Sequence, residues 1–169
     1  PVVTSVTHDT NTAVFKLAPL PAGATVLADL FTALSEKGIV VDVISQSELT
    51  QGQQLAFSVP VEDIFQTRQV IEKKFSKADC WVMDHVSKVS IVGVGMRNHP
   101  GVAAKFFDVL AKHNISIHLV TTSEIKVSAI VEAILGLEPG QLSARTDDFC
   151  KHMHPADRER FKLLLNSIK

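Results

Sequence analysis

The segment MRNHPGVAA at 96–104 has the residue types of a small anion-binding loop. It follows an apolar run typical of a strand and precedes a helical pattern, and the first N–H groups of a helix are free to bind a carboxylate. Gly101 lets a ligand approach the main chain, and Pro100 suits the first helical position, where no N–H is needed. The pattern fits a carboxylate site, but taken alone it is better interpreted as an ordinary strand-to-helix turn that uses Asn-His-Pro-Gly.

A second polar segment, TTSEIK at 121–126, lies between two further apolar runs. Thr122 and Ser123 offer hydroxyls and Glu124 offers a carboxylate, which are groups that pair with an ammonium or a polar side chain. Ser and Glu are also common in hairpin turns. The segment alone therefore fits either a pocket wall or a simple turn.

Nucleotide chemistry and nucleophilic catalysis are not supported. Gly93, Gly95 and Gly101 do not have the G-x-G-x-x-G spacing, and no G-K-[ST] follows them. No Ser–His–Asp or Cys–His set occurs in a recognisable context. We therefore expect no catalytic residue in this chain and no cofactor.

A metal site is also not expected. Cys80 and Cys150 are too far apart for a Cys-x-x-Cys motif, and two thiols in a reducing cytosol are better read as idle or buried than as a disulfide. Cys150, His152 and His154 lie close together, but no second cluster partners them. A solvated loop is the better interpretation of that segment.

Size and composition describe an ordinary globular protein of one domain or two small ones. The chain has 169 residues, of which 46% are hydrophobic and 21% charged, and its formal net charge is −1. This charge gives no electrostatic footprint for nucleic acid, and no window has the apolar length needed to cross a membrane. The N-terminal PVVTSVTHDTNT lacks the basic and apolar regions of a secretory signal, so we expect a cytoplasmic location.

The elements that position these segments occur twice. Residues 26–45 align with residues 102–121 without a gap, and both copies have an apolar stripe of helical spacing. The stripes are Leu27, Leu30, Phe31 and Leu34 in one copy and Ala103, Phe106, Phe107 and Leu110 in the other. Gly38 or Asn114 then ends the helix in a turn, and an apolar strand follows at 39–44 or 115–120.

The flanking runs complete a β-α-β-β-α-β unit. One strand is expected before each helix, at 13–17 and at 89–95. A further strand is expected after each polar turn, at 55–59 and at 125–131. In the first copy a second helix follows near 64–75, and then a fourth strand at 80–86. This order predicts an α+β fold of two ferredoxin-like modules. The second copy lacks a fourth strand, so we expect the spare strand at 2–7 to complete it and interlock the modules. The modules would be 12–86 and 2–8 plus 88–169, with a helix in the tail carrying the stripe from Phe161 to Ile168.

The segment from Lys88 to Ser128 resembles the second regulatory ACT module of bacterial aspartate kinases. Two long signatures carry the resemblance, GVGMRNHPGVAA in the loop and TSEIKVS in the following strand pair. The layout of 12–86, including IVVDVISQS and FSVP, is similar to the first such module, and the resemblance covers about residues 2–131.

The resemblance implies the regulatory region of an aspartate kinase and not a catalytic domain. It implies feedback regulation by lysine, threonine or both, with the effector bound where modules of two chains meet. The expected partners are the amino-acid effector, a second copy in a homodimer joined through module edges, and the catalytic domain or subunit of the kinase, which phosphorylates the aspartate side-chain carboxylate with ATP. A ferredoxin-like interaction module, or a sensing domain of another enzyme, is the alternative.

The resemblance also implies the effector contacts, residue by residue. They fall on the helix-start loop, the start of the second strand, the opposite wall and one position of the first module: Asn98, His99, Pro100, Gly101, Val102 and Ala103; Ser116 and Ile117; Thr122, Ser123 and Glu124; and Gln46. Two departures affect the first module, where Ala22 stands about where the family has an acid and Val40 replaces a polar residue. We therefore expect its half-site to be degraded.

Overall fold

The computed structural model describes residues 3–112 and 114–132. The chain divides into two compact units. We call Asn11–His85 the first unit, and Pro1–Thr10 together with Val86–Lys169 the second unit.

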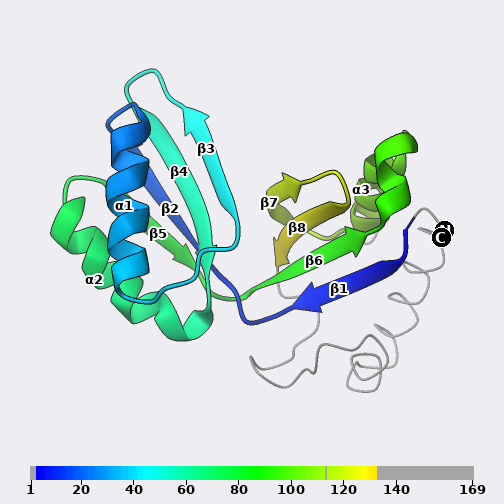
Figure 1. Cartoon of the computed structure of the whole chain (residues 1–169), viewed down its shortest axis with the longest axis horizontal. Coiled ribbons are helices and arrows are strands. Elements are labelled where there is room, and N and C mark those ends of the chain that lie inside the picture. The colour runs from blue at the N-terminus through cyan, green and yellow to red at the C-terminus, as the bar shows by residue number, and fades with distance from the viewer. Residues whose placement is uncertain (1–2, 113, 133–169) are drawn as a thin grey trace. The chain divides into compact units, whose positions relative to one another are not determined.

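The first unit is a four-stranded antiparallel sheet with two helices packed on one face (Figure 1). The strands lie in the order β3-β4-β2-β5. In chain order the elements are β2 (Ala13–Leu20), α1 (Ala24–Glu36), β3 (Ile44–Glu48), β4 (Gln53–Val59), α2 (Ile64–Lys74) and β5 (Asp79–Met83), with a 3-10 turn at Val61–Asp63 before α2. Inward-facing residues of β2 and β4 form its core, where Phe15 stacks on Phe57 with ring centroids 5.6 Å apart and Phe31 of α1 meets Phe57 edge-on at 5.8 Å.

The second unit repeats this plan with a strand from the other end of the sequence. Its sheet has the order β1-β6-β8-β7 and contains β1 (Ser5–Asp9), β6 (Val86–Val92), β7 (Ile117–Thr122) and β8 (Lys126–Glu132) (Figure 1). A 3-10 turn (Val94–Asn98) and α3 (Val102–Lys112) connect β6 to β7, and α3 buries Phe106 and Leu110 against the sheet. Because β1 pairs antiparallel with β6, the N-terminal strand fills the fourth position, and the interlocked α+β fold is confirmed.

Both repeat helices end as their turn residues predict. Gly38 and Asn114 have positive φ values of 72° and 53°, the left-handed conformation that ends a helix. In each case the next residue donates its N–H back into the last turn, Ile39 to Leu34 and Ile115 to Leu110.

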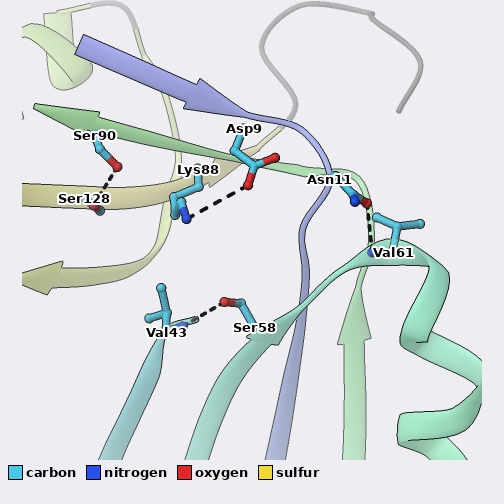
Figure 2. A network of polar contacts seen from close by, with 8 residues as sticks. All are labelled: Asp9, Asn11, Val43, Ser58, Val61, Lys88, Ser90 and Ser128. Atoms are coloured by element: carbon cyan, nitrogen blue, oxygen red, sulfur yellow. Dashed lines mark hydrogen bonds and ion pairs between the residues drawn. The ribbon is translucent and has the colours of Figure 1, made fainter. Parts of the chain in front are cut away.

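Some predicted strand boundaries are wrong. Only Ile44 of the run 39–44 belongs to a strand, because β3 begins there, and the backbone N–H of Val43 donates to Ser58 Oγ at 3.0 Å (Figure 2). A side-chain acceptor thus replaces the main-chain partner there. The predicted strand 89–95 is shifted to Val86–Val92, and β1 is shifted from 2–7 to Ser5–Asp9. The tail helix lies outside the described residues.

Polar contacts inside each unit hold strand ends and strand pairs in register (Figure 2). In the first unit, Asn11 Oδ1 accepts the N–H of Val61 at 3.0 Å. In the second unit, Asp9 lies opposite Lys88 on paired strands, with 4.0 Å between the carboxylate and the ammonium. The directly opposed hydroxyls of Ser90 and Ser128 are 2.6 Å apart and buried. These cross-strand pairs contribute to specifying the register of β1, β6 and β8.

Candidate functional site

The predicted anion-binding loop connects β6 to α3 in the second unit. Asn98 ends the 3-10 turn, His99 is extended, and Gly101 has a φ of 92°. The carbonyl of Gly101 accepts the N–H of Lys105 at 2.9 Å, so Gly101 is the N-cap and the helix begins at Val102. The prediction that Pro100 takes the first helical position is therefore wrong, because the left-handed conformation at Gly101 cannot belong to a helix.

His99 belongs to the loop's own structure. Its Nδ1 lies 2.7 Å from the carbonyl oxygen of Gly95, and because a carbonyl only accepts, this nitrogen carries the proton. The loop thus folds back over its 3-10 turn, while Met96 packs against the core. The imidazole stabilises the loop that leads to Gly101.

The second predicted segment lies against this loop. Thr122 ends β7, and the N–H of Ser123 donates to the carbonyl of Lys126 at 2.7 Å, which makes 123–126 a tight turn. The N–H of Gly93 donates to the carbonyl of Ile125 at 2.8 Å, and this bond joins the loop to the turn. The start of the loop and the turn therefore meet at one end of the sheet, where Thr122, Ser123 and Glu124 are exposed.

Ser116 and Ile117 lie at the opposite end of the same sheet. Ile117 pairs with Val131, and the backbone of Ser116 exchanges two contacts with Glu132: its N–H donates to Glu132 Oε1 at 3.2 Å, and its carbonyl accepts the N–H of Glu132 at 3.2 Å. Five residue steps along β7 separate Ile117 from Thr122, about 17 Å in an extended strand. Within a single chain, the predicted contact residues of the second unit are therefore too far apart to bind the same amino acid.

Gln46 lies in the first unit, on the edge strand β3. The helix-start loop of that unit has Gly23 as N-cap with a φ of 106° and no side-chain cap. Val40, at the position of the expected polar residue, is 68% exposed and precedes β3. These features give the first unit a helix start without the polar residues that the second unit offers.

Two side chains near the predicted positions were missed by sequence reasoning. Gln53 is buried and contacts Gln46 as well as the carbonyls of Pro21 and Gly23. The side-chain carboxylate of Glu132 accepts a hydrogen bond from the N–H of Ser116. Neither belongs to a motif, and only the strand pairing brings them to their partners.

Comparison with solved structures identifies this arrangement of paired units. The regulatory subunit of aspartate kinase from Thermus thermophilus, in its ligand-free form, superposes with a TM-score of 0.72 and 34% identity, covering 78% of this chain and 89% of that one. The chain belongs to the family of aspartate kinase regulatory subunits. A family model described as the ACT domain matches residues 89–134 of this regulatory chain, which include the loop, α3 and the TSEIK turn.

Longer relatives contain a region that is similar to this chain. Aspartokinase 2 of Bacillus subtilis is 44% identical over 117 residues, which is 66% of this chain but 28% of the relative. The chain thus spans less than a third of the length of that enzyme. Aspartokinase III of E. coli, solved with lysine and aspartate, shares the fold at 19% identity and a TM-score of 0.61, covering 79% of this chain and 30% of that one.

Among the residues that the structure describes, His8 and Cys80 have shifted pKa values. Burial lowers the pKa of His8 to about 4, against the opposing charge of Asp9. Burial raises the pKa of the Cys80 thiol and so disfavours its thiolate, and the charge of Arg68 partly offsets this shift. Across 3–112 and 114–132, no three metal-binding side chains form a cluster and no helix is long and apolar enough to span a membrane. Cys150, His152 and His154 lie outside the described residues.

Proposed function

We propose that this chain is the regulatory region of an aspartate kinase and binds lysine or threonine to mediate feedback inhibition of aspartate-family amino-acid synthesis. The observation that supports the proposal is the 2.8 Å bond from the N–H of Gly93 to the carbonyl of Ile125, which joins the start of the loop before α3 to the turn that contains Ser123 and Glu124. A carboxylate-binding group and an ammonium-binding group at one sheet end suit a free amino acid.

The helix start of α3 binds the effector carboxylate in this proposal. The first N–H groups of a helix have no acceptor within it, and the helix dipole favours an anion there. Apart from the chain neighbours of Gly101, no atom of the residues that the structure describes lies within 4 Å of where its Cβ would be, so the ligand can approach the main chain. Asn98 and His99 complete this side of the pocket, and the N–H groups of Val102 and Ala103 face the carboxylate.

A second chain completes the pocket. β7 is an edge strand, and its exposed Ile117 and Val120 are the apolar residues that a partner would cover. Two β7 edges related by a two-fold axis run antiparallel, so the start of one strand lies beside the end of the other. Ser116 and Ile117 of one chain would then face the Thr122–Glu124 turn of its partner, and their carbonyls would bind the α-ammonium.

Glu124 makes lysine the preferred effector over threonine. Its carboxylate suits the side-chain ammonium of lysine, whereas threonine needs only the hydroxyls of Thr122 and Ser123. The lysine bound to the E. coli enzyme is consistent with this choice. The effector-bound dimer would act on the catalytic domain or subunit of the kinase, which transfers phosphate from ATP to aspartate.

Calorimetric titration of the chain with lysine and threonine, separately and together, tests the proposal. We expect lysine to bind saturably and threonine to bind more weakly or compete. A folded protein that binds neither amino acid would contradict the proposal. That result would favour the alternative, a ferredoxin-like module that only contacts other proteins.

A further inference from the structure

The helix α1 of the first unit has a groove along its surface. Among the residues that the structure describes, those lining the groove all belong to α1: Leu27, Ala28, Phe31, Thr32, Ser35 and Glu36. They form two rows with a spacing of four residues, Leu27–Phe31–Ser35 and Ala28–Thr32–Glu36. The groove is therefore the space between two adjacent ridges of the helix, and a ridge of a second helix is the shape that fits it.

The groove has an apolar base that the core of the first unit supports. Leu27 and Phe31 are half-buried, and the ring of Phe31 meets Phe57 of β4 edge-on with centroids 5.8 Å apart. The remaining residues of the two rows are exposed and, except for Glu36, have small side chains. A second helix can therefore approach closely and cover apolar surface.

The lining residues are arranged symmetrically along the helix. Two antiparallel copies of α1, related by a two-fold axis between positions 31 and 32, bring three kinds of pair together: Phe31 with Thr32, Ala28 with Ser35, and Leu27 with Glu36. Each large apolar side chain then faces a smaller or more flexible one, and the same surface serves both copies. An isologous contact requires this kind of self-complementarity.

The charges of α1 favour the same antiparallel arrangement. The first turn of α1 has no acidic residue, its N-cap Gly23 gives no side-chain hydrogen bond, and its last turn has no basic residue. Glu36 instead ends the helix, where the helix dipole disfavours an anion. In the antiparallel pair, Glu36 of each copy lies beside the first turn of the other copy, where the dipole favours it.

We propose that this surface of α1 is an association surface, and that its partner is α1 of a second copy of the chain, packed antiparallel. The contact joins first units and is separate from the β7 contact between second units. One helix pair buries less area than a stable interface needs, so the contact adds to the β7 contact and does not replace it. It requires no amino acid and therefore goes beyond the proposed function.

Disulfide crosslinking of the full chain tests the position and direction of the two helices. The variants carry a single cysteine, Thr32→Cys or Thr25→Cys, with Cys80 and Cys150 replaced by alanine. Thr32 lies next to the proposed two-fold axis. Thr25 is also exposed on α1 but lies about 20 Å from its own copy, because about 13 residue steps separate the two positions along antiparallel helices.

Under mild oxidation without effector, we expect Thr32→Cys to form covalent dimers about tenfold faster than Thr25→Cys, because the pair holds the two thiols together. Equal rates would indicate chance collisions or a parallel pair, and either result would overturn the proposal. The absence of covalent dimers for Thr32→Cys would also overturn it and would leave the groove to a different protein. A failure to bind lysine or threonine would refute only the proposed function.

Glu36→Lys separates association from folding. Lysine suits the last turn of α1, so the free energy of unfolding should not fall, but the same charge is unfavourable beside the first turn of the other copy. In the Thr32→Cys protein, Glu36→Lys should slow crosslinking about threefold or more, because the contact occurs twice. Glu72→Lys, at an exposed acid near the end of α2, should leave the rate unchanged. An unchanged rate in Glu36→Lys would overturn the antiparallel arrangement.

Discussion

Gly93 and Ile125 are joined by a main-chain hydrogen bond of 2.8 Å, which ties the end of β6 to the turn before β8. Because β6 and β7 run in the same direction on either side of β8, the loop after one and the turn after the other meet at the same sheet end. Two polar segments that are separated in the sequence by the helix α3 thereby lie at the same end of the sheet. The predictions below test what that end of the sheet binds.

Gly101→Asp should weaken effector binding strongly. The substitution places a carboxylate beside the N–H groups that we assign to the effector carboxylate, and losing one charge-assisted contact costs about 1.5–3 kcal/mol of binding free energy. The left-handed conformation at Gly101 also costs a non-glycine residue about 1–2 kcal/mol of folding stability. Titration of the folded variant with lysine measures the first effect, and urea unfolding measures the second.

Gly23→Asp is the matched control for that variant. Gly23 has a similar φ of 106°, is also the N-cap of its helix, and likewise has no atom within 4 Å of an added Cβ. Its stability cost should therefore equal that of Gly101→Asp, while effector affinity stays near wild type. Equal losses of affinity in both variants would mean that general destabilisation, and not the pocket, causes the effect.

Val120→Lys should convert the proposed dimer to a monomer. Val120 is 41% exposed on the edge strand β7, and a lysine there opposes its own copy across the two-fold axis and blocks edge pairing. Sedimentation velocity at tens of micromolar, with and without lysine, measures the change. Val40→Lys, at an exposed valine outside any strand, should remain dimeric; a dimeric Val120→Lys variant would exclude β7 as the interface.

Much of the fold could be predicted because it depends on local patterns that occur twice. The stripe containing Phe31 and Leu34, repeated at Phe107 and Leu110, requires a helix on a sheet in each copy, and the missing fourth strand of the second copy predicts the role of β1. The strand at 39–44 begins later than predicted, at Ile44, and Asp42 and Val43 instead bond irregularly to the backbone and hydroxyl of Ser58, a pattern that hydrophobic periodicity does not reveal. In the site, the loop and the turn are local motifs. The link from Gln53 to Pro21 spans 32 residues and follows only from the folded sheet.

Thr67→Val should stabilise the first unit. Thr67 in α2 is fully buried, and its Oγ1 has no hydrogen-bond partner in the part of the chain that the structure describes. Valine has nearly the same shape and helix propensity, so removing the hydroxyl should raise the free energy of unfolding by about 1 kcal/mol. Urea unfolding measures this. Thr32→Val on the exposed side of α1 should change stability by less than about 0.5 kcal/mol.

His8 should make the protein less stable in mild acid. Its pKa is about 4 in the folded state and 6.5 in the unfolded chain, so the unfolded state binds more protons between these values. The stability linked to this lowered pKa is fully present above pH 6.5 and is lost as the pH falls toward 4. Over this range the free energy of unfolding decreases with a slope approaching about 1.4 kcal/mol per pH unit. Urea unfolding at pH 7, 6 and 5 should show a smaller loss for His8→Phe than for wild type. Parallel losses would mean that other groups cause the acid sensitivity.

Glu124→Gln should weaken the binding of lysine much more than the binding of threonine. The substitution keeps the size and hydrogen-bonding capacity of the side chain but removes the charge that pairs with the lysine side-chain ammonium. At a partly desolvated chain–chain interface that pair is worth about 1–3 kcal/mol, whereas an exposed pair would be worth less than about 1 kcal/mol. We expect about a tenfold or larger loss of lysine affinity in calorimetric titration, with threonine affinity nearly unchanged.

The control for Glu124→Gln is Glu62→Gln, which removes the same charge at an exposed position in the first unit. It should leave both affinities unchanged, because Glu62 is not among the residues that we assign to the pocket and its exposed charge is screened by salt. Raising the salt concentration should reduce the lysine preference of the wild type only slightly if Glu124 is desolvated in the complex, and strongly if it stays exposed. Equal losses for the two amino acids in Glu124→Gln would show that Glu124 supports the turn and does not read the side chain.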